Sequence, residues 1–91
     1  MEEKFLDIKE IDIRNKKKYI GFKMALRAVK EGNAGLVYMA GDINDKMKEQ
    51  ILSECHNYSV EVCHIETMKQ LGKAALIEVG AAVVAIDKSY L

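Results

Sequence analysis

Two runs of this sequence are apolar throughout, Leu36 to Ala40 and Ala81 to Ile86. Each has the length of a β-strand, and successive side chains of a strand point to opposite faces of its sheet. A strand that is apolar on both faces is buried on both, which requires helices above and below the sheet. Strand-like and helical segments also alternate at short spacing along the chain. We therefore predict an α/β fold, a three-layer α/β/α sandwich with a small mixed sheet.

The segment Ile20 to Gly32 has the period of an amphipathic helix. One face carries the apolar residues Phe22, Ala25, Leu26 and Val29, and another carries the basic residues Lys23, Arg27 and Lys30. Gly32 is a natural helix end, and Gly21 would let another backbone approach the start of the helix. Tyr19 and Ile20 are expected to form a short extended piece before it.

Capping signals predict two further helices. Asn44 is a suitable N-cap for the second helix, which Asn57 would end. Thr67 and Gln70 fit a capping box at the start of a third helix, Met68 to about Ala75. The buried stripe of the second helix is expected to be Met47, Ile51, Leu52 and Cys55.

The other segments are less regular. Ser59 to Ile65 has the composition of a strand, and Asp87 to Leu91 is expected to be a tail or a closing helical turn. Residues 1–13 fit a short amphipathic helix that breaks near Asn15, although Ile11 to Arg14 also alternates like a strand.

Basic residues are concentrated in one part of the chain. Arg14 to Lys30 contains seven Lys or Arg residues and no Asp or Glu, while the formal net charge of the whole chain is zero. The start of a helix carries unpaired N–H groups and partial positive charge, so Gly21 to Met24 would be an anion site. Lys16, Lys17 and Lys18 directly precede it and would add to it. Phosphate is the expected partner, and the alternative is an ordinary solvated surface.

Length and composition narrow the class of protein. Ninety-one residues suit one domain, 1–91, with residues 1–15 as an uncertain N-terminal segment and residues 16–87 as the α/β/α part. The acidic start does not resemble a secretory signal, and no apolar run approaches the length of a transmembrane helix. We therefore expect a cytoplasmic protein.

Residue types that bind zinc occur in two pairs, Cys55-His56 and Cys63-His64. Their spacing is not a usual zinc pattern, and neighbours on a strand point to opposite faces, so we predict no metal site. Cys55 instead fits the core. Asp42 and Glu66 follow predicted strands and are better explained as caps or turn residues than as an acid–base pair. Motifs of the G-x-x-x-x-G-K, H-E-x-x-H and G-x-S-x-G types are missing, so we predict no enzymatic activity and no cofactor.

Four blocks of sequence follow one another from residue 20 to residue 86: I-G-F-K-M-A-L-R-A-V-K-E-G, L-V-Y-M-A-G-D-I-N-D, V-E-V-C-H-I-E-T-M-K-Q-L-G-K-A and I-E-V-G-A-A-V-V-A-I. In order and spacing they resemble the blocks of the kink-turn-binding ribosomal-protein family. This family includes the archaeal large-subunit protein L-seven-Ae, the eukaryotic L-thirty-e and small bacterial relatives. The similarity runs from about Lys17 to Ile86 and is greatest to the bacterial members.

The resemblance implies an α/β/α fold that binds RNA with a sharp kink flanked by sheared G·A pairs. The implied partner is structured RNA, with the ribosome as one setting and no membrane; a homo-oligomer is left open and is not predicted. The head of the helix would read guanine edges and adjacent phosphates, and a second loop would pack against the bases that splay out at the kink. The expected RNA-binding residues are Gly21, Lys23, Met24 and Arg27, with Lys17 and Lys18 from the basic run, and Ile77, Glu78, Val79, Gly80 and Ala81 in the loop.

Several positions depart from the family pattern. Met24 stands where relatives carry a glutamate or glutamine that hydrogen-bonds the base edge, and a methionine cannot make that bond. Leu76 replaces a glycine just before the second loop, Phe22 replaces a threonine, and Gly41 and Asp45 replace a charged residue and a proline. A second hypothesis is therefore a protein-interaction or scaffold module of the same fold that has lost kink-turn binding.

Overall fold

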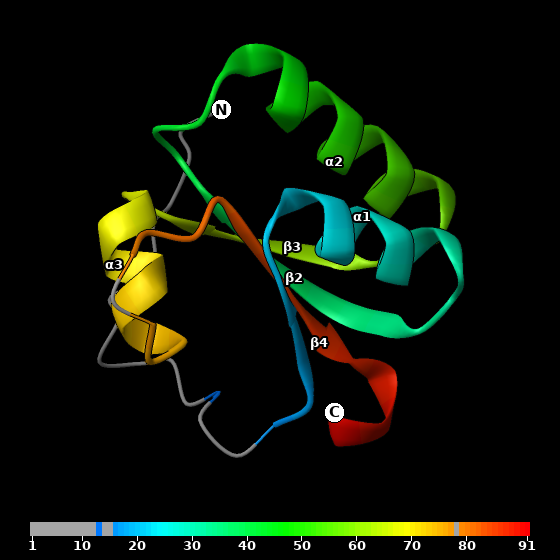
Figure 1. Ribbon diagram of the computed structural model, residues 1–91. Coiled ribbons are helices and arrows are strands. Elements are labelled where there is room, and N and C mark those ends of the chain that lie inside the picture. Colours follow the sequence, from blue (N-terminus) through cyan, green and yellow to red (C-terminus); the bar gives the residue numbers. More distant parts are fainter. Residues whose placement is uncertain (1–12, 14–15, 78) are drawn as a thin grey trace.

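The computed structural model describes residues 13, 16–77 and 79–91. In this part of the chain four strands form one mixed sheet, flanked by three α-helices (Figure 1). The elements are β1 (Lys18–Ile20), α1 (Phe22–Lys30), β2 (Ala34–Ala40), α2 (Asp45–Asn57), β3 (Glu61–Ile65), α3 (Met68–Ala74), β4 (Val83–Asp87) and a 3-10 helix (Lys88–Tyr90). The predicted α/β fold is confirmed, and the predicted closing helical turn is the 3-10 helix.

The sheet has the strand order β1-β4-β2-β3. β4 pairs antiparallel with both β1 and β2, while β3 pairs parallel with β2. The ends of β1, β2 and β3 therefore lie at the same end of the sheet as the start of β4. We call this the carboxyl end of the sheet; it comprises Gly21 and residues 41–44, 66–67 and 80–82. Each α-helix also begins there.

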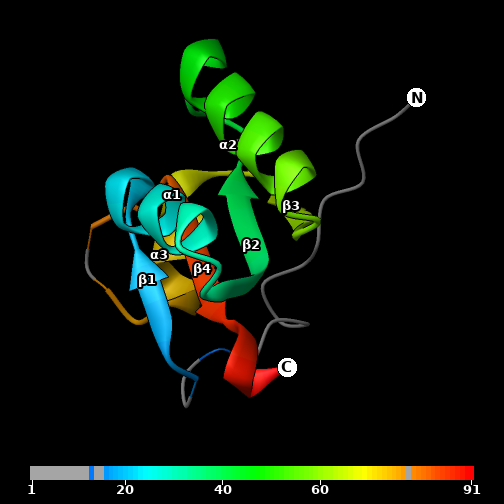
Figure 2. The same cartoon turned by 90° about the vertical axis from the view of Figure 1, so that its right-hand side faces the viewer.

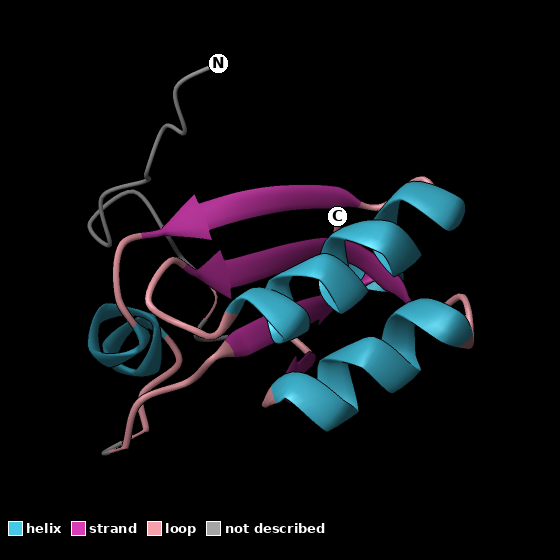
Figure 3. Ribbon diagram, turned by 90° about the horizontal axis from the view of Figure 1, so that it is seen from above, coloured by secondary structure: helices cyan, strands magenta, loops and turns pink. Residues whose placement is uncertain are grey.

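Helices cover the sheet on both faces. α1 and α2 contact each other on one side, and Figure 3 shows them side by side with α3 apart from them. In Figures 1 and 2 the sheet lies between α1 and α3. All residues of β4 are buried, as expected for a central strand covered on both faces. The predicted three layers are therefore present.

The core lies between the sheet and these helices. α1 buries Ala25, Ala28 and Val29, and Phe22 and Leu26 pack partly against the core. α2 buries Ile51 and Cys55, as predicted. The prediction for Leu52 is wrong, because its side chain is 40% exposed. α2 turns a narrow face to the sheet, and a residue directly after Ile51 lies about 100° around the helix from it.

Side-chain caps begin two of the helices where the sequence predicts them. Asn44 Oδ1 accepts a hydrogen bond from the Met47 N–H at 2.8 Å, and Thr67 Oγ1 accepts one from the Gln70 N–H at 3.2 Å. Asp42 adds a contact between loops, since its Oδ1 accepts from the Met68 N–H at 2.8 Å. The expectation that Asp42 acts as a cap is confirmed.

The helices end in one common arrangement. A residue with positive φ follows each helix, and the N–H after it donates back to a carbonyl five residues earlier, as in the Schellman motif. The positive-φ residues are Gly32 at 75°, Ser59 at 56° and Leu76 at 60°. The end predicted at Gly32 is therefore confirmed. β3 begins later than predicted because Ser59 belongs to this turn, and β4 extends over Val83–Asp87.

The expectation of a short helix over residues 1–13 falls outside the described residues, except for Ile13, which is fully buried. Within the part of the chain that the structure describes, no helix is long and apolar enough to cross a membrane.

Candidate functional site

Gly21 forms the corner between β1 and α1. Its φ of 102° is a conformation that residues with a Cβ rarely adopt. A Cβ there would meet no atom of the described residues within 4 Å, so within this structure the backbone conformation is what requires glycine. Among the residues that the structure describes, no side chain caps this helix start. The first N–H groups of α1 therefore remain available to an anion.

The loop of residues 75–82 connects α3 to β4 and is tied down at several points. The Ile77 N–H donates to the Gly72 carbonyl at 3.0 Å, and the Ala81 N–H donates to the Met68 carbonyl at 3.0 Å. A Cβ on Gly80 would lie 3.0 Å from the Cβ of Met68. The loop backbone thus lies directly on α3.

Side chains of this loop differ in exposure. Val79 is 73% exposed and Leu76 is 68% exposed, while Ile77 is half-buried against the core. Ala81 is only 3% exposed, so its side chain belongs to the core and is not available to a partner. The predicted contact of Ala81 with RNA would therefore have to be through its backbone. Glu78 lies outside the described residues.

The two predicted contact segments meet at the carboxyl end of the sheet. The Gly21 N–H donates to the Val83 carbonyl at 2.8 Å, which joins the start of α1 to the strand that follows the loop. In Figure 1 the corner before α1 and the loop entering β4 lie at the same end of the sheet. Lys23 and Met24 are exposed on the first turn of α1, Met24 to 51%.

Lys17 and Lys18 are far from this corner. Lys18 pairs with Ile86 near the end of β4, and Lys17 Nζ lies 3.9 Å from Asp87 Oδ2. An extended strand advances about 3.3 Å per residue, so Lys17 lies about 13 Å from Gly21. The expectation that these lysines flank the helix start is therefore wrong, because Lys17 precedes β1 and Lys18 begins it, at the end of the strand opposite to Gly21.

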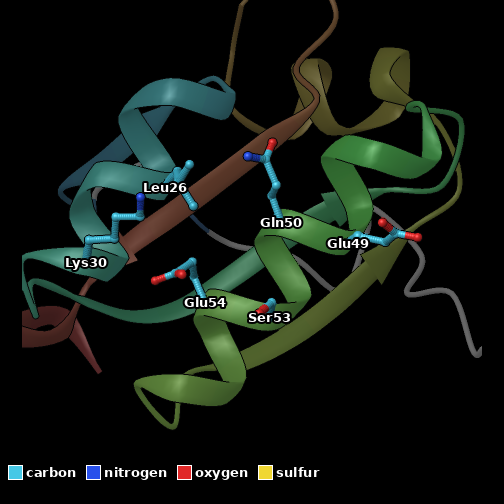
Figure 4. Close-up of a pocket in the computed structure, with 6 residues that line it drawn as sticks. All are labelled: Leu26, Lys30, Glu49, Gln50, Ser53 and Glu54. Atoms are coloured by element: carbon cyan, nitrogen blue, oxygen red, sulfur yellow. The ribbon is translucent and has the colours of Figure 1, made fainter.

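Lys30 also lies away from the start of α1. It lies at the end of α1 over an open groove of ≈ 220 Å³ between α1 and α2. The lining residues are Leu26, Lys30, Glu49, Gln50, Ser53 and Glu54 (Figure 4). Figure 4 shows Lys30 and Glu54 on facing helices, so the Lys30 ammonium faces the acidic side chains of α2. The basic stretch of the sequence is thus dispersed over the fold.

Arg27 forms an ion pair along α1. Its Nε lies 3.5 Å from Glu31 Oε1, one helical turn later, with side chains 72% and 51% exposed. Lys23 has no ion-pair partner among the described residues. The two basic side chains predicted to contact RNA therefore differ in their pairing: among the described residues Lys23 has no ion-pair partner, whereas Arg27 is paired with Glu31.

A polar cluster that the sequence analysis did not find joins β1 to the C-terminal turn. The Tyr19 hydroxyl donates to Asp87 Oδ2 at 2.7 Å, and the Ser89 hydroxyl and N–H donate to Asp87 Oδ1 at 2.6 and 3.0 Å. The Ser89 donors, then Tyr19 and Lys17, lower the pKa of Asp87 to about 2. The spacing Asp-x-Ser after a buried strand was the available signal.

The cysteines lie on separate elements. Cys55 is 1% exposed in the core, as predicted, and burial raises its pKa to about 11. Cys63 is half-buried in β3, and burial also raises its pKa. Among the described residues, no group of His, Cys, Asp and Glu side chains could hold a metal ion.

Comparison with known proteins gives consistent matches. Residues 9–90 match the Ribosomal protein L7Ae/L30e/S12e/Gadd45 family. A protein of Geobacillus thermodenitrificans named RNA-binding protein is 42% identical over 67 residues, 74% of this chain and 82% of that protein. The large ribosomal subunit protein eL8 of Halobacterium salinarum is 34% identical over 67 residues, 72% of this chain and 56% of that protein.

Solved structures show the same fold. The 15.5kD RNA binding protein of Giardia lamblia superposes with a TM-score of 0.70 at 29% identity, over 78% of this chain and 60% of that one. The family match covers most of the sequence and the fold agrees with it. This chain therefore belongs to the Ribosomal protein L7Ae/L30e/S12e/Gadd45 family.

Proposed function

We propose that this protein binds structured RNA with a sharp kink, of the kink-turn type, at the carboxyl end of its sheet. The observation that carries the proposal is the 2.8 Å hydrogen bond from the Gly21 N–H to the Val83 carbonyl. This bond holds the start of α1 beside the loop of residues 75–82, so one RNA can contact both. Relatives in the family that are named RNA-binding proteins support the same class of partner.

The exposed groups at this end suit the two parts of a kinked RNA. The free N–H groups of α1 and the Lys23 ammonium are donors for phosphates, and the Arg27 guanidinium can donate to O6 and N7 of a guanine. Unstacked bases bind apolar surface, which the exposed Val79 side chain supplies next to Gly80. Arg27 would have to leave Glu31, but an exposed pair at this spacing stabilises by only about 0.3–0.5 kcal/mol.

The test compares a kink-turn RNA with the same RNA lacking its G·A pairs, each over a series of salt concentrations. We expect tight binding to the first alone. The informative variants are Lys23→Ala and Lys30→Ala, which remove the same charge from the two ends of α1. Lys23→Ala should weaken binding to the kink-turn RNA, whereas Lys30→Ala should have little effect. Equal losses, or equal binding to both RNAs, would leave only nonspecific attraction to lysines.

Exposed apolar side chains on α1 and on the loop after α3 favour a second candidate, a protein-interaction module. Met24, Leu76 and Val79 are each more than half exposed. A surface of this kind can bind a protein as well as unstacked bases. If the kink-turn RNA does not bind, replacing Val79 with Ser and measuring self-association by gel filtration would test this function.

A further inference from the structure

A second hollow flanks α1 on the side away from α2. It has a volume of ≈ 220 Å³ and is lined by Tyr19, Met24, Arg27, Ala28 and Glu31. Tyr19 belongs to β1, and Figure 2 shows this edge strand beside α1. We call this hollow the Tyr19 cleft. It begins at the first turn of α1, directly next to the proposed RNA surface, and runs along the helix to its last turn.

The walls of the Tyr19 cleft combine an aromatic ring with a donor and an acceptor. The Tyr19 hydroxyl donates to Asp87, and the Lys17 ammonium lies 5.9 Å from the centroid of the ring, so what the residue offers to a ligand is the part of its ring that Lys17 does not cover. Arg27 has only donors and Glu31 has only acceptors, and the two groups are 3.5 Å apart. Only Arg27 Nε and Glu31 Oε1 are used by this ion pair, and among the described residues the other polar atoms of both groups have no partner.

The charges argue against phosphate as the ligand. One cation and one carboxylate line the Tyr19 cleft, and beyond it Lys17 and Asp87 also pair with each other. An anion would therefore gain little here and would be repelled by Glu31. A neutral planar ligand with a hydrogen-bond acceptor beside donors matches the walls better.

We propose that the Tyr19 cleft binds an unstacked guanine base. Guanine presents the O6 acceptor next to its N1–H and N2–H donors, so Arg27 can donate to O6 while both oxygens of Glu31 accept from the nitrogens. Tyr19 and Met24 supply the surface on which the ring stacks. Adenine has a single donor group on the equivalent edge and cannot satisfy both carboxylate oxygens. The proposal rests on the proposed function in taking the base to come from RNA.

The first test titrates guanosine 5′-monophosphate into the full chain and follows backbone amide resonances by NMR. We expect saturable shifts centred on Tyr19, Met24, Arg27 and Glu31, and much weaker shifts with adenosine 5′-monophosphate. Glu31→Gln should weaken guanosine monophosphate binding about tenfold, because one carboxylate acceptor becomes a donor. Glu49→Gln is the matched control, since it removes an exposed carboxylate of α2 that lines the groove on the other side of α1. Equal binding of the two nucleotides, or an unaffected Glu31→Gln variant, would overturn the proposal.

Substitutions of Tyr19 test the stacking surface. Tyr19→Leu should weaken guanosine monophosphate binding about tenfold, since the ring no longer stacks on the base. Tyr19→Phe keeps the ring and loses only the bond to Asp87, so it should bind as the unmodified protein does. If Tyr19→Leu binds guanosine monophosphate unchanged, the base does not occupy this cleft.

A final comparison separates the source of the guanine and separates this proposal from the proposed function. Short oligouridine with one central guanosine should bind more tightly than oligouridine alone, and Glu31→Gln should abolish the difference. No difference in the unmodified protein would overturn the assignment to RNA. Lys23→Ala should weaken kink-turn RNA binding and leave guanosine monophosphate binding intact. If the kink-turn RNA does not bind but guanosine monophosphate shifts the resonances around the cleft, the proposed function is wrong and the guanine site is supported.

Discussion

Gly72 in α3 faces the backbone carbonyl oxygen of Val79, and a Cβ on Gly72 would overlap that oxygen. The same stretch of loop touches α3 again through Gly80 and Met68. α3 and the loop of residues 75–82 therefore behave as one packed unit, and the absence of a side chain at residue 72 sets the position of the loop. This unit forms one half of the proposed RNA surface.

We predict that Gly72→Ala destabilises the fold. Alanine is the better helix former by about 1 kcal/mol, so an unhindered site would gain stability from the change. The overlap with a backbone oxygen instead forces α3 and the loop apart, with an expected net loss of about 1–3 kcal/mol. Urea unfolding measures the difference. Lys73→Ala, at the exposed neighbouring position, is the control and should be nearly neutral; a stabilised Gly72→Ala protein would show that the loop yields easily.

Leu76 holds a conformation that suits glycine. Its φ is 60° at the Schellman position after α3, and its side chain is 68% exposed. A left-handed conformation costs a residue with a Cβ about 1–2 kcal/mol, and glycine gives back part of the gain through its more flexible unfolded state. We expect Leu76→Gly to stabilise the protein by about 0.5–1 kcal/mol in thermal unfolding.

Leu76→Ala is the matched control for this prediction. It removes the same exposed side chain but keeps the Cβ, so the backbone strain should persist and no comparable gain should be seen. A Leu76→Gly protein no more stable than Leu76→Ala would mean that the positive φ carries little strain.

The sequence predicted the helices and strands more accurately than it predicted how they are placed relative to one another. Asn44, Thr67 and Gly32 specify helix ends through local hydrogen bonds and backbone conformation, so those boundaries were predictable. The position of Lys17 was not. The position of Lys17 depends on the extended conformation of β1, which separates Lys17 from the start of α1, and on the nonlocal pairing of β1 with β4. Charge density in a sequence therefore does not indicate a charged patch.

Two features of the fold depend on how helices pack on the sheet, the exposure of Leu52 and the Tyr19 cleft. The exposure of Leu52 depends on how wide a face of α2 the sheet can cover, which only the assembled layers decide. The ion pair of Arg27 with Glu31 follows from spacing along one helix and could have been predicted from the sequence. The Tyr19 cleft needs the strand and the helix together, so it emerges only from the structure.

The Asp87 cluster makes stability depend on pH in the acid range. Donors from Ser89 and Tyr19 lower the pKa of Asp87 to about 2 from 3.8. A carboxyl group whose pKa is lower in the folded state stabilises the fold above the unfolded pKa, and this contribution is lost as the pH falls through the folded value. We expect the urea midpoint to fall between about pH 4 and pH 2. In Asp87→Asn the midpoint should be lower at pH 7 and should change less over that interval.

Tyr19→Phe tests the cause of the shift directly. It removes one donor to Asp87 and leaves both Ser89 donors, so the pKa of Asp87 should move upward toward 3.8 without reaching it. Carboxyl NMR titration measures this value. Tyr90→Phe is the control, because Tyr90 is exposed and makes no bond to Asp87 among the described residues. An unchanged Asp87 pKa in Tyr19→Phe would assign the shift to Ser89 and Lys17.

We expect Met24 to affect the affinity of this protein for the proposed kink-turn RNA. Met24 is 51% exposed on the first turn of α1, beside Arg27, at a position where the family resemblance implies a glutamate or glutamine acceptor. Met24→Gln restores a side chain that can hydrogen-bond a base edge, and glutamine is as good a helix former as methionine. A net hydrogen bond of about 0.5–1.5 kcal/mol corresponds to roughly two- to tenfold tighter binding of a kink-turn RNA. Leu52→Gln, which places a glutamine on an exposed position in the middle of α2 without a change of charge, should produce no gain. If Met24→Gln weakens binding instead, the methionine itself contacts the RNA, and this protein recognises a different RNA from the one its family pattern indicates.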